Sequence, residues 1–278
     1  MKKLIYILVI FFSVDLSAQV NYSDFITSGE ATSYKKQAVR ERPVIAYPYL
    51  READVKFSRR VIRCIDSRQK MNKQLEWPRM PLRRVLYESL VKGDLVAYKN
   101  DSLLPFYNTE DFQRRGGSEI IVFYSTDPED PTIGVDSPVN VPFDYEKIKK
   151  YWIMEDWIFD YKHSVFKPRI LALAPIFSPS YGGGPGRDQP LCWINMDELR
   201  PLLAGTEMFN RYNDAARLSY DDFFQMRIFD SYIIYESNVF DNKINEFTEY
   251  QDDGVASLLK SDEIKNDLFI FEHDLWQY

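Results

Sequence analysis

Two strand-like runs separated by a short turn constrain the fold of this chain more than any other feature. Residues 151–160 and 164–176 are rich in Trp, Ile, Phe and Val, and Tyr161, Lys162 and His163 lie between them. Aromatic and β-branched residues favour strands, and two such runs joined by a short turn predict a hairpin. We therefore expect antiparallel strands in this half of the chain.

Other segments carry helix patterns. Apolar spacing and capping residues predict helices over 55–71, 81–93, a segment capped by Asn195, 219–236 and 262–271. In the first, Asp54 is the expected cap and Val61, Cys64 and Ile65 share one face. Short strand-like runs occur at 95–99, 119–124 and 191–194, and a loop at 178–190. Helices and strands occur in groups without strict alternation, so the fold class is α+β.

Charge divides the chain into two parts. Residues 19–117 contain 19 Lys and Arg against 12 Asp and Glu, whereas residues 118–278 contain 14 against 29. Residues 125–142 hold four prolines close to this boundary and are predicted to be a linker or a binding loop. We expect either two lobes, basic over 51–124 and acidic over 143–278, or one bipartite domain. Such a distribution suits an assembly part with several partners, although drift between two lobes is the alternative.

The N-terminus has the pattern of a secretory signal. Lys2 and Lys3 precede an apolar run from Leu4 to Phe12, and small and polar residues lead to a predicted cleavage after Ala18. Nine apolar residues are too few for a membrane-spanning helix, which needs roughly 20. No Cys stands at the cleavage point, where a bacterial lipoprotein carries its lipid, so lipid attachment is not expected. Residues 1–18 are therefore a predicted signal peptide, and 19–50 a predicted extended arm.

Cysteine and histidine are scarce. Cys64 and Cys192 lie too far apart in the chain for a metal-binding spacing, and either a disulfide or two buried thiols would fit them. His163 and His273 are predicted to be surface residues. We predict no metal and no cofactor.

Basic residues gather in the first predicted helix. Lys56, Arg59, Arg60 and Arg63 are three or four positions apart, which would place them on one surface. An exported acidic protein makes nucleic acid an improbable partner, so docking onto an acidic protein surface or an anionic head group is the functional interpretation. An ordinary solvated face is the alternative.

Two further hypotheses stay open on residues alone. A hydrolase acting on glycan or peptide would use two of five carboxylates: Glu155, Asp156, Asp160, Asp188 and Asp222. A glycan-binding module would stack sugars on exposed rings of Trp152, Trp157, Trp193 and Tyr181, whereas buried rings would indicate core packing.

Three segments together resemble the GldN/PorN family. The first runs from Pro48 to Asp66 with Lys70-Met71-Asn72, and the second from Ile148 to Asp160 with Ser164 and Arg169 to Pro175. The third, near the C-terminus, consists of Arg227-Ile228-Phe229-Asp230-Ser231-Tyr232-Ile233, Glu236-Ser237-Asn238 and Asp274-Leu275-Trp276. Met154 and Ala172 depart from the pattern of the family.

The resemblance implies a non-enzymatic structural subunit of the type IX protein secretion and gliding motility machinery of Bacteroidetes. It implies a periplasmic ring built with a GldK/PorK-type outer-membrane lipoprotein and other copies of this chain. It also implies a contact with the periplasmic part of a GldM/PorM-type motor protein, and it supplies no catalytic residues.

Overall fold

A computed structural model describes residues 43–275, except for residues 116, 126–133, 142, 182–183, 214 and 252. The predicted signal peptide and most of the predicted arm therefore lie outside the described residues. Within the described part, no helix is both long enough and apolar enough to cross a bilayer.

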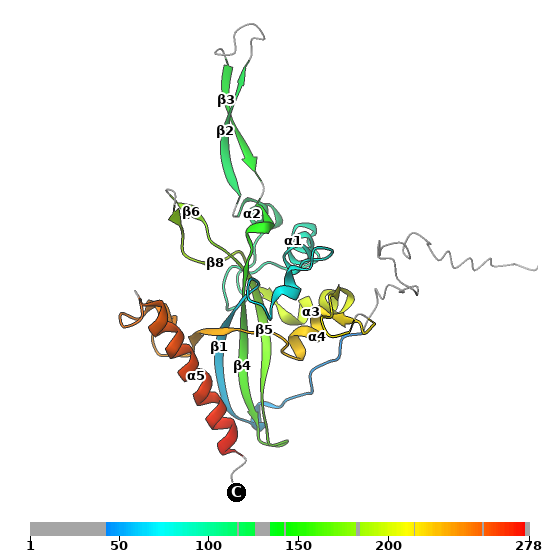
Figure 1. The fold of residues 1–278 in the computed structure, drawn as a ribbon, viewed down its shortest axis with the longest axis vertical. Helices are drawn as coiled ribbons and strands as arrows, with labels where there is room; N and C mark the ends of the chain where they lie inside the picture. The colour runs from blue at the N-terminus through cyan, green and yellow to red at the C-terminus, as the bar shows by residue number, and fades with distance from the viewer. Residues whose placement is uncertain are drawn as a thin grey trace, which may run out of the picture. The chain divides into compact units, whose positions relative to one another are not determined.

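A six-stranded antiparallel sheet forms the centre of the fold (Figure 1). Its main order is β12-β1-β4-β5-β8, and β9 also pairs with β5. The strands are β1 (Val55–Asp66), β4 (Lys150–Asp160), β5 (Val165–Phe177), β8 (Gln189–Pro190), β9 (Ile194–Asn195) and β12 (Tyr232–Glu236). The predicted hairpin is confirmed as β4 and β5, which pair along almost their whole length.

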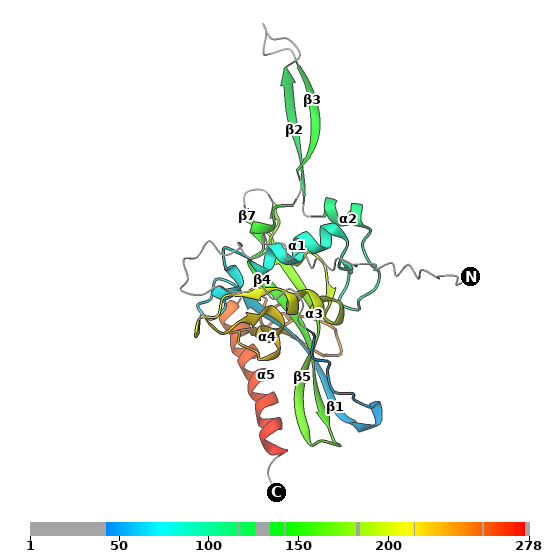
Figure 2. The same cartoon turned by 90° about the vertical axis from the view of Figure 1, so that its right-hand side faces the viewer.

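Helices cover one face of this sheet in two groups (Figures 1 and 2). The first group packs around Ile65, Tyr151 and Ile153, and the second around Val61, Phe166 and Ile233. The first group is α1 (Leu82–Lys92), α2 (Thr109–Arg114), α3 (Met196–Gly205) and α4 (Tyr220–Gln225), and the second is α5 (Gly254–Asp274).

The opposite face of the sheet is also buried. Trp152 and Met154 alternate with Tyr151 and Ile153 along β4, and they pack with Trp193 in a separate cluster. Successive side chains of a strand point to opposite faces, so β4 contributes to a core on each side.

Smaller elements complete the fold. Within the part of the chain that the structure describes, two-stranded sheets pair β2 (Ser118–Ser125) with β3 (Gly134–Val141), β6 (Ser180–Tyr181) with β7 (Gly184–Pro185), and β10 (Glu207–Met208) with β11 (Leu218–Ser219). The 3₁₀ turns of the described residues are η2 (Glu52–Asp54), η3 (Lys73–Glu76), η4 (Tyr145–Lys147) and η5 (Ile244–Glu246).

The helix predicted over 55–71 is wrong. Residues 55–66 form β1, which pairs with β4 on one edge and with β12 on the other. The spacing of basic residues resembled a helix, but each arginine of this segment has an ion-pair partner on β4 or β12. Pairing between distant segments thus overrode the local pattern.

The helix predicted over 219–236 is correct only at its start. Ser219 and Asp222 form the expected capping box, but α4 ends at Gln225 and residues 232–236 form β12. Arg227 follows with a left-handed φ of 54°, a conformation that interrupts a helix. The longest helix among the described residues is instead α5, which begins eight residues before the predicted 262–271 segment.

Of the short predicted strands, the run at 119–124 is confirmed as part of β2. The strand predicted over 95–99 is wrong, because within this run only Tyr98 forms isolated bridges, with Phe106 and Trp193, and the strand predicted over 191–194 is displaced to β9 at Ile194–Asn195.

Helix α1 and the cap by Asn195 are confirmed. Residues 134–141, predicted to be part of a linker or loop, form β3, and residues 126–133 lie outside the described part. Because β1 from the basic segment lies between β4 and β12 from the acidic segment, the two charge segments share one sheet. Cys64 and Cys192 are free and buried.

Candidate partner-binding surfaces

The four predicted basic residues do not share one surface. Arg59 and Arg63 point to one face of β1 and Arg60 to the other, since strand side chains alternate. Lys56 is the extra residue where the β1–β4 register shifts, and its ammonium lies 5.9 Å from the centre of the Tyr161 ring.

Each of the three arginines already has a carboxylate partner within the chain. Arg59 Nη1 lies 2.7 Å from Glu236 Oε1. Arg60 binds both carboxylate oxygens of Asp156, at 2.8 and 3.0 Å. The side chains of Arg59 and Arg60 remain 41% and 45% exposed, so they could still touch a second molecule.

Arg63 belongs to a buried cluster around Glu155. The Glu155 carboxylate is fully buried and accepts hydrogen bonds from Arg63 and Arg227. Trp157 Nε1 donates a further bond to it at 2.9 Å, and the two guanidinium groups lie 5.7 and 5.8 Å from the centre of the Trp157 ring. A buried arginine held in this way is a structural residue and presents no surface to a partner.

Electrostatics explain why Glu155 tolerates burial. Burial alone would raise the pKa of its carboxyl group, but the charges of Arg227 and Arg63 outweigh that effect. The pKa of Glu155 therefore lies below its ordinary value, and the residue is ionised near neutral pH.

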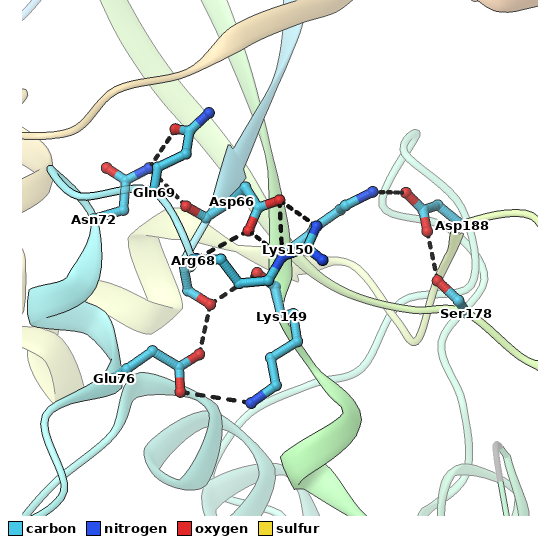
Figure 3. A network of polar contacts seen from close by, with 10 residues as sticks. Asp66, Arg68, Gln69, Asn72, Glu76, Lys149, Lys150, Ser178 and Asp188 are labelled. Carbon is cyan, nitrogen blue, oxygen red and sulfur yellow. Dashed lines mark hydrogen bonds and ion pairs between the residues drawn. The ribbon is translucent and has the colours of Figure 1, made fainter. Parts of the chain in front are cut away.

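A polar network joins the end of β1 to the start of β4 and to the loop after β5 (Figure 3). Ser67 Oγ lies 2.9 Å from the Lys149 carbonyl oxygen and 2.5 Å from a carboxylate oxygen of Glu76, and its single proton is shared between these two acceptors. Lys150 Nζ lies 2.5 Å from an oxygen of Asp188. Ser178 Oγ donates to the other oxygen of Asp188 at 2.5 Å. These contacts fix the ends of segments that lie far apart in sequence.

The segment around Ile45 and Tyr47, which precedes β1, is held in place by the side chain of Arg200 on α3. Arg200 Nη2 donates to the Ile45 carbonyl at 2.5 Å, and its guanidinium lies 4.5 Å from the centre of the Tyr47 ring. Arg200 also binds Asp221 at 3.0 Å, and both of these side chains are buried. Part of the predicted arm therefore follows a defined path over α3 and α4.

The five carboxylates considered for hydrolysis all have partners within the chain. Glu155 and Asp156 pair with arginines, Asp160 binds His163, Asp188 binds Lys150, and Asp222 completes the cap of α4. The described side chains also contain no group of three His, Cys, Asp or Glu residues placed to hold a metal ion.

The rings considered for glycan stacking are mostly enclosed. Trp152 and Trp193 are buried, with ring centres 6.4 Å apart, and the Trp157 ring contacts two arginine side chains. The Tyr181 side chain lies outside the described residues. Core packing, the alternative given above, therefore holds for Trp152 and Trp193.

Apolar side chains on the outside of α5 form a feature that the sequence analysis missed. Five of them, with exposed fractions from 49% to 67%, are Val255, Leu258, Leu259, Phe269 and Ile270. Their spacing was a usable signal, but the predicted helix began at residue 262 and so omitted three of them.

A second exposed apolar site lies in the loop after β12. Val239 and Phe240 are 97% and 73% exposed. Asn238 organises this loop, because its side chain accepts from the amides of Phe240 and Asn242 and donates to the carbonyls of Glu236 and Asn242. A loop fixed in this way presents two apolar side chains outward with little freedom to withdraw them.

The fold and these surfaces define an α+β protein with a central antiparallel sheet, an ion-paired sheet face and an outward-facing apolar helix. The family model for the gliding motility associated protein GldN matches residues 50–277, and the chain belongs to this family. Among curated proteins, no match to the chain was found.

Proposed function

We propose that this protein is a non-enzymatic structural subunit of the type IX secretion and gliding motility machinery. The observation that carries this proposal is the family match over residues 50–277, which includes all strands of the central sheet. In this role the chain forms part of a periplasmic ring of Bacteroidetes, with an outer-membrane lipoprotein of the GldK/PorK type and other copies of itself. A GldM/PorM-type periplasmic domain is a further partner.

The state of the carboxylates supports a role without catalysis. Hydrolysis of a glycoside requires two carboxyl groups that face the substrate. Here Glu155 is enclosed by two arginines, and Asp156, Asp160 and Asp188 each bind a basic side chain. Their negative charges are thus compensated within the chain.

The predicted signal peptide supports a periplasmic location. Export would bring the mature chain to the compartment where the lipoprotein partner is anchored, and attachment to the outer membrane would be indirect, through that partner. Membrane fractionation of cells with and without the lipoprotein gene tests this location. We expect the protein to leave the membrane fraction when the lipoprotein is absent.

For the lipoprotein contact, we propose three of the four predicted basic residues. Arg63 is enclosed, whereas Lys56, Arg59 and Arg60 keep exposed charge on β1, with Arg59 and Arg60 on opposite faces of the strand. Because opposite charges steer association and exposed pairs are screened by salt, contact through these residues should weaken as ionic strength rises.

Copurification with the lipoprotein tests this proposal. We expect large particles at low salt that dissociate at high salt, and weaker association for the double variant Lys56→Glu, Arg60→Glu. Arg84→Glu is the matched control, because Arg84 is an exposed, ion-paired arginine on α1. A protein that stays monomeric in the presence of the lipoprotein at low salt would contradict the proposed assembly. If Arg84→Glu weakens association as much as the double variant does, the proposed role of β1 is wrong.

A further inference from the structure

Helix α5 has two apolar faces, and only one of them is used by the fold. Its inner face places Ser261, Ile264 and Leu268 against the sheet, where all three are buried. The outer face carries the five exposed apolar residues named above. An amphipathic helix of a monomer normally has polar residues on its outer side, so this pattern indicates a helix that packs on both sides.

The outer residues lie in two groups along the helix. Val255, Leu258 and Leu259 occupy the first turns, and Phe269 and Ile270 lie near the other end. At about 100° per residue, all five point away from Ile264. Both views draw α5 along the outside of the sheet (Figures 1 and 2).

We propose that α5 packs antiparallel against α5 of a second copy of this chain, with the two-fold axis near residue 264. In this arrangement Leu258 of one copy meets Phe269 of the other, and Leu259 meets Ile270. By symmetry each contact occurs twice, so both apolar groups of both helices are covered.

Charge complementarity supports the same register. Between the two apolar groups, Asp262 of one helix lies opposite Lys265 of the other, and Glu263 lies opposite Asn266. A parallel pair would instead bring Asp262 against Asp262 at the centre of the contact, where like charges repel. The polar residues that interrupt the apolar face therefore favour the antiparallel orientation.

This contact goes beyond the proposed function and does not depend on it. A two-fold contact uses the same surface on both copies and joins subunits in pairs without extending further. Ring closure would need another surface, such as the exposed basic residues of β1. Loss of the α5 contact should therefore leave binding to the lipoprotein intact.

Cross-linking between single-cysteine variants tests the register. We expect an equimolar mixture of Leu258→Cys and Phe269→Cys chains to form a disulfide-linked dimer on mild oxidation, and either variant alone to form much less. Cys64 and Cys192 are buried and should stay silent. Preferential linkage of Leu258→Cys to itself would indicate a parallel pair and overturn the proposal, as would no linkage in the mixture.

Sedimentation of the mature protein provides a second readout. We expect a concentration-dependent dimer whose dissociation constant rises by at least about tenfold in Leu259→Glu. Val239→Glu is the matched control, because Val239 is also exposed but lies off α5. Urea denaturation of both variants verifies the fold. A protein that is monomeric at all concentrations, or a control that dissociates equally, overturns the proposal.

Discussion

At the residue scale, the buried carboxylate of Glu155 should contribute strongly to the stability of the fold. Its carboxylate is fully buried between Arg63 and Arg227, and removal of the negative charge would leave two guanidinium groups without compensation. Breaking a buried ion pair costs about 3–5 kcal/mol. We therefore expect Glu155→Gln to lower the free energy of unfolding by about that amount in urea titrations.

The neighbouring residue supplies the control. Asp156→Asn removes a partner of Arg60, whose side chain is 45% exposed, and exposed pairs contribute about 0–1 kcal/mol. If the two variants lose similar stability, the distinction between buried and exposed pairs drawn above is wrong.

The contribution of the Glu155 carboxylate should also make stability depend on pH. The pKa of Glu155 in the folded protein is below its ordinary value of 4.5, so its contribution to stability is complete above about pH 4.5 and is lost as pH falls through the folded-state pKa. We expect the urea midpoint of the wild type to fall more steeply below about pH 4.5 than that of Glu155→Gln. Parallel pH dependences would show that other carboxylates dominate acid unfolding.

The two thiols should be inert in the native state. Burial raises the pKa of Cys64 to about 11 and also raises the pKa of Cys192. The thiolate is the reactive form, so a thiol reagent near pH 8 should modify neither residue until denaturant is added. Fast modification of the folded protein would contradict the burial of these side chains.

At the scale of elements, α5 is tied to the edge of the sheet by one hydrogen bond. The backbone amide of Ile233 in β12 donates to Ser261 Oγ at 2.7 Å. Removing the hydroxyl leaves a buried amide without its acceptor, which costs about 1–3 kcal/mol. We expect Ser261→Ala to lower the free energy of unfolding and to speed hydrogen exchange at the Ile233 amide.

A second serine of the same helix serves for comparison. Ser257→Ala changes a position that is only partly buried, whereas the Ile233 amide has the Ser261 hydroxyl as its acceptor. Exchange at Ile233 should remain slow in this variant. Equal acceleration in both would mean that helix propensity, and not the hydroxyl, controls the edge strand.

Some elements could be predicted from sequence because their signals are local. The caps at Asn195 and Ser219 and the turn between β4 and β5 each depend on residues a few positions apart. These interactions exist in any context in which the segment folds, so single-sequence patterns detect them.

The error over 55–66 has the opposite cause. Arg59 forms an ion pair with Glu236, 177 residues away in the sequence, and Arg60 forms one with Asp156, 96 residues away. Periodicity within the segment carries no information about such partners. For the same reason the sequence indicated basic residues on β1 without revealing that Arg63 is enclosed, and the outer face of α5 was missed because its first turns were not recognised as helical.

For the whole molecule, the charge boundary does not coincide with a structural boundary. Strand β1 belongs to the basic segment and lies between β4 and β12 of the acidic segment. The described residues belong to one compact unit. We expect a single unfolding transition in urea, with coincident curves from far-UV circular dichroism and tryptophan fluorescence. Two separate transitions would support two independent lobes.

The position of β1 in the sheet also sets an order of events during biosynthesis. This strand emerges first, yet its partners β4 and β12 are made only near the middle and towards the end of translation. Pairing across such separations is slow, because a long loop must close before the contacts form. For the export proposed above, the central sheet would therefore stay unformed during most of synthesis. Its folding would wait for the C-terminal third of the chain, which contains β12.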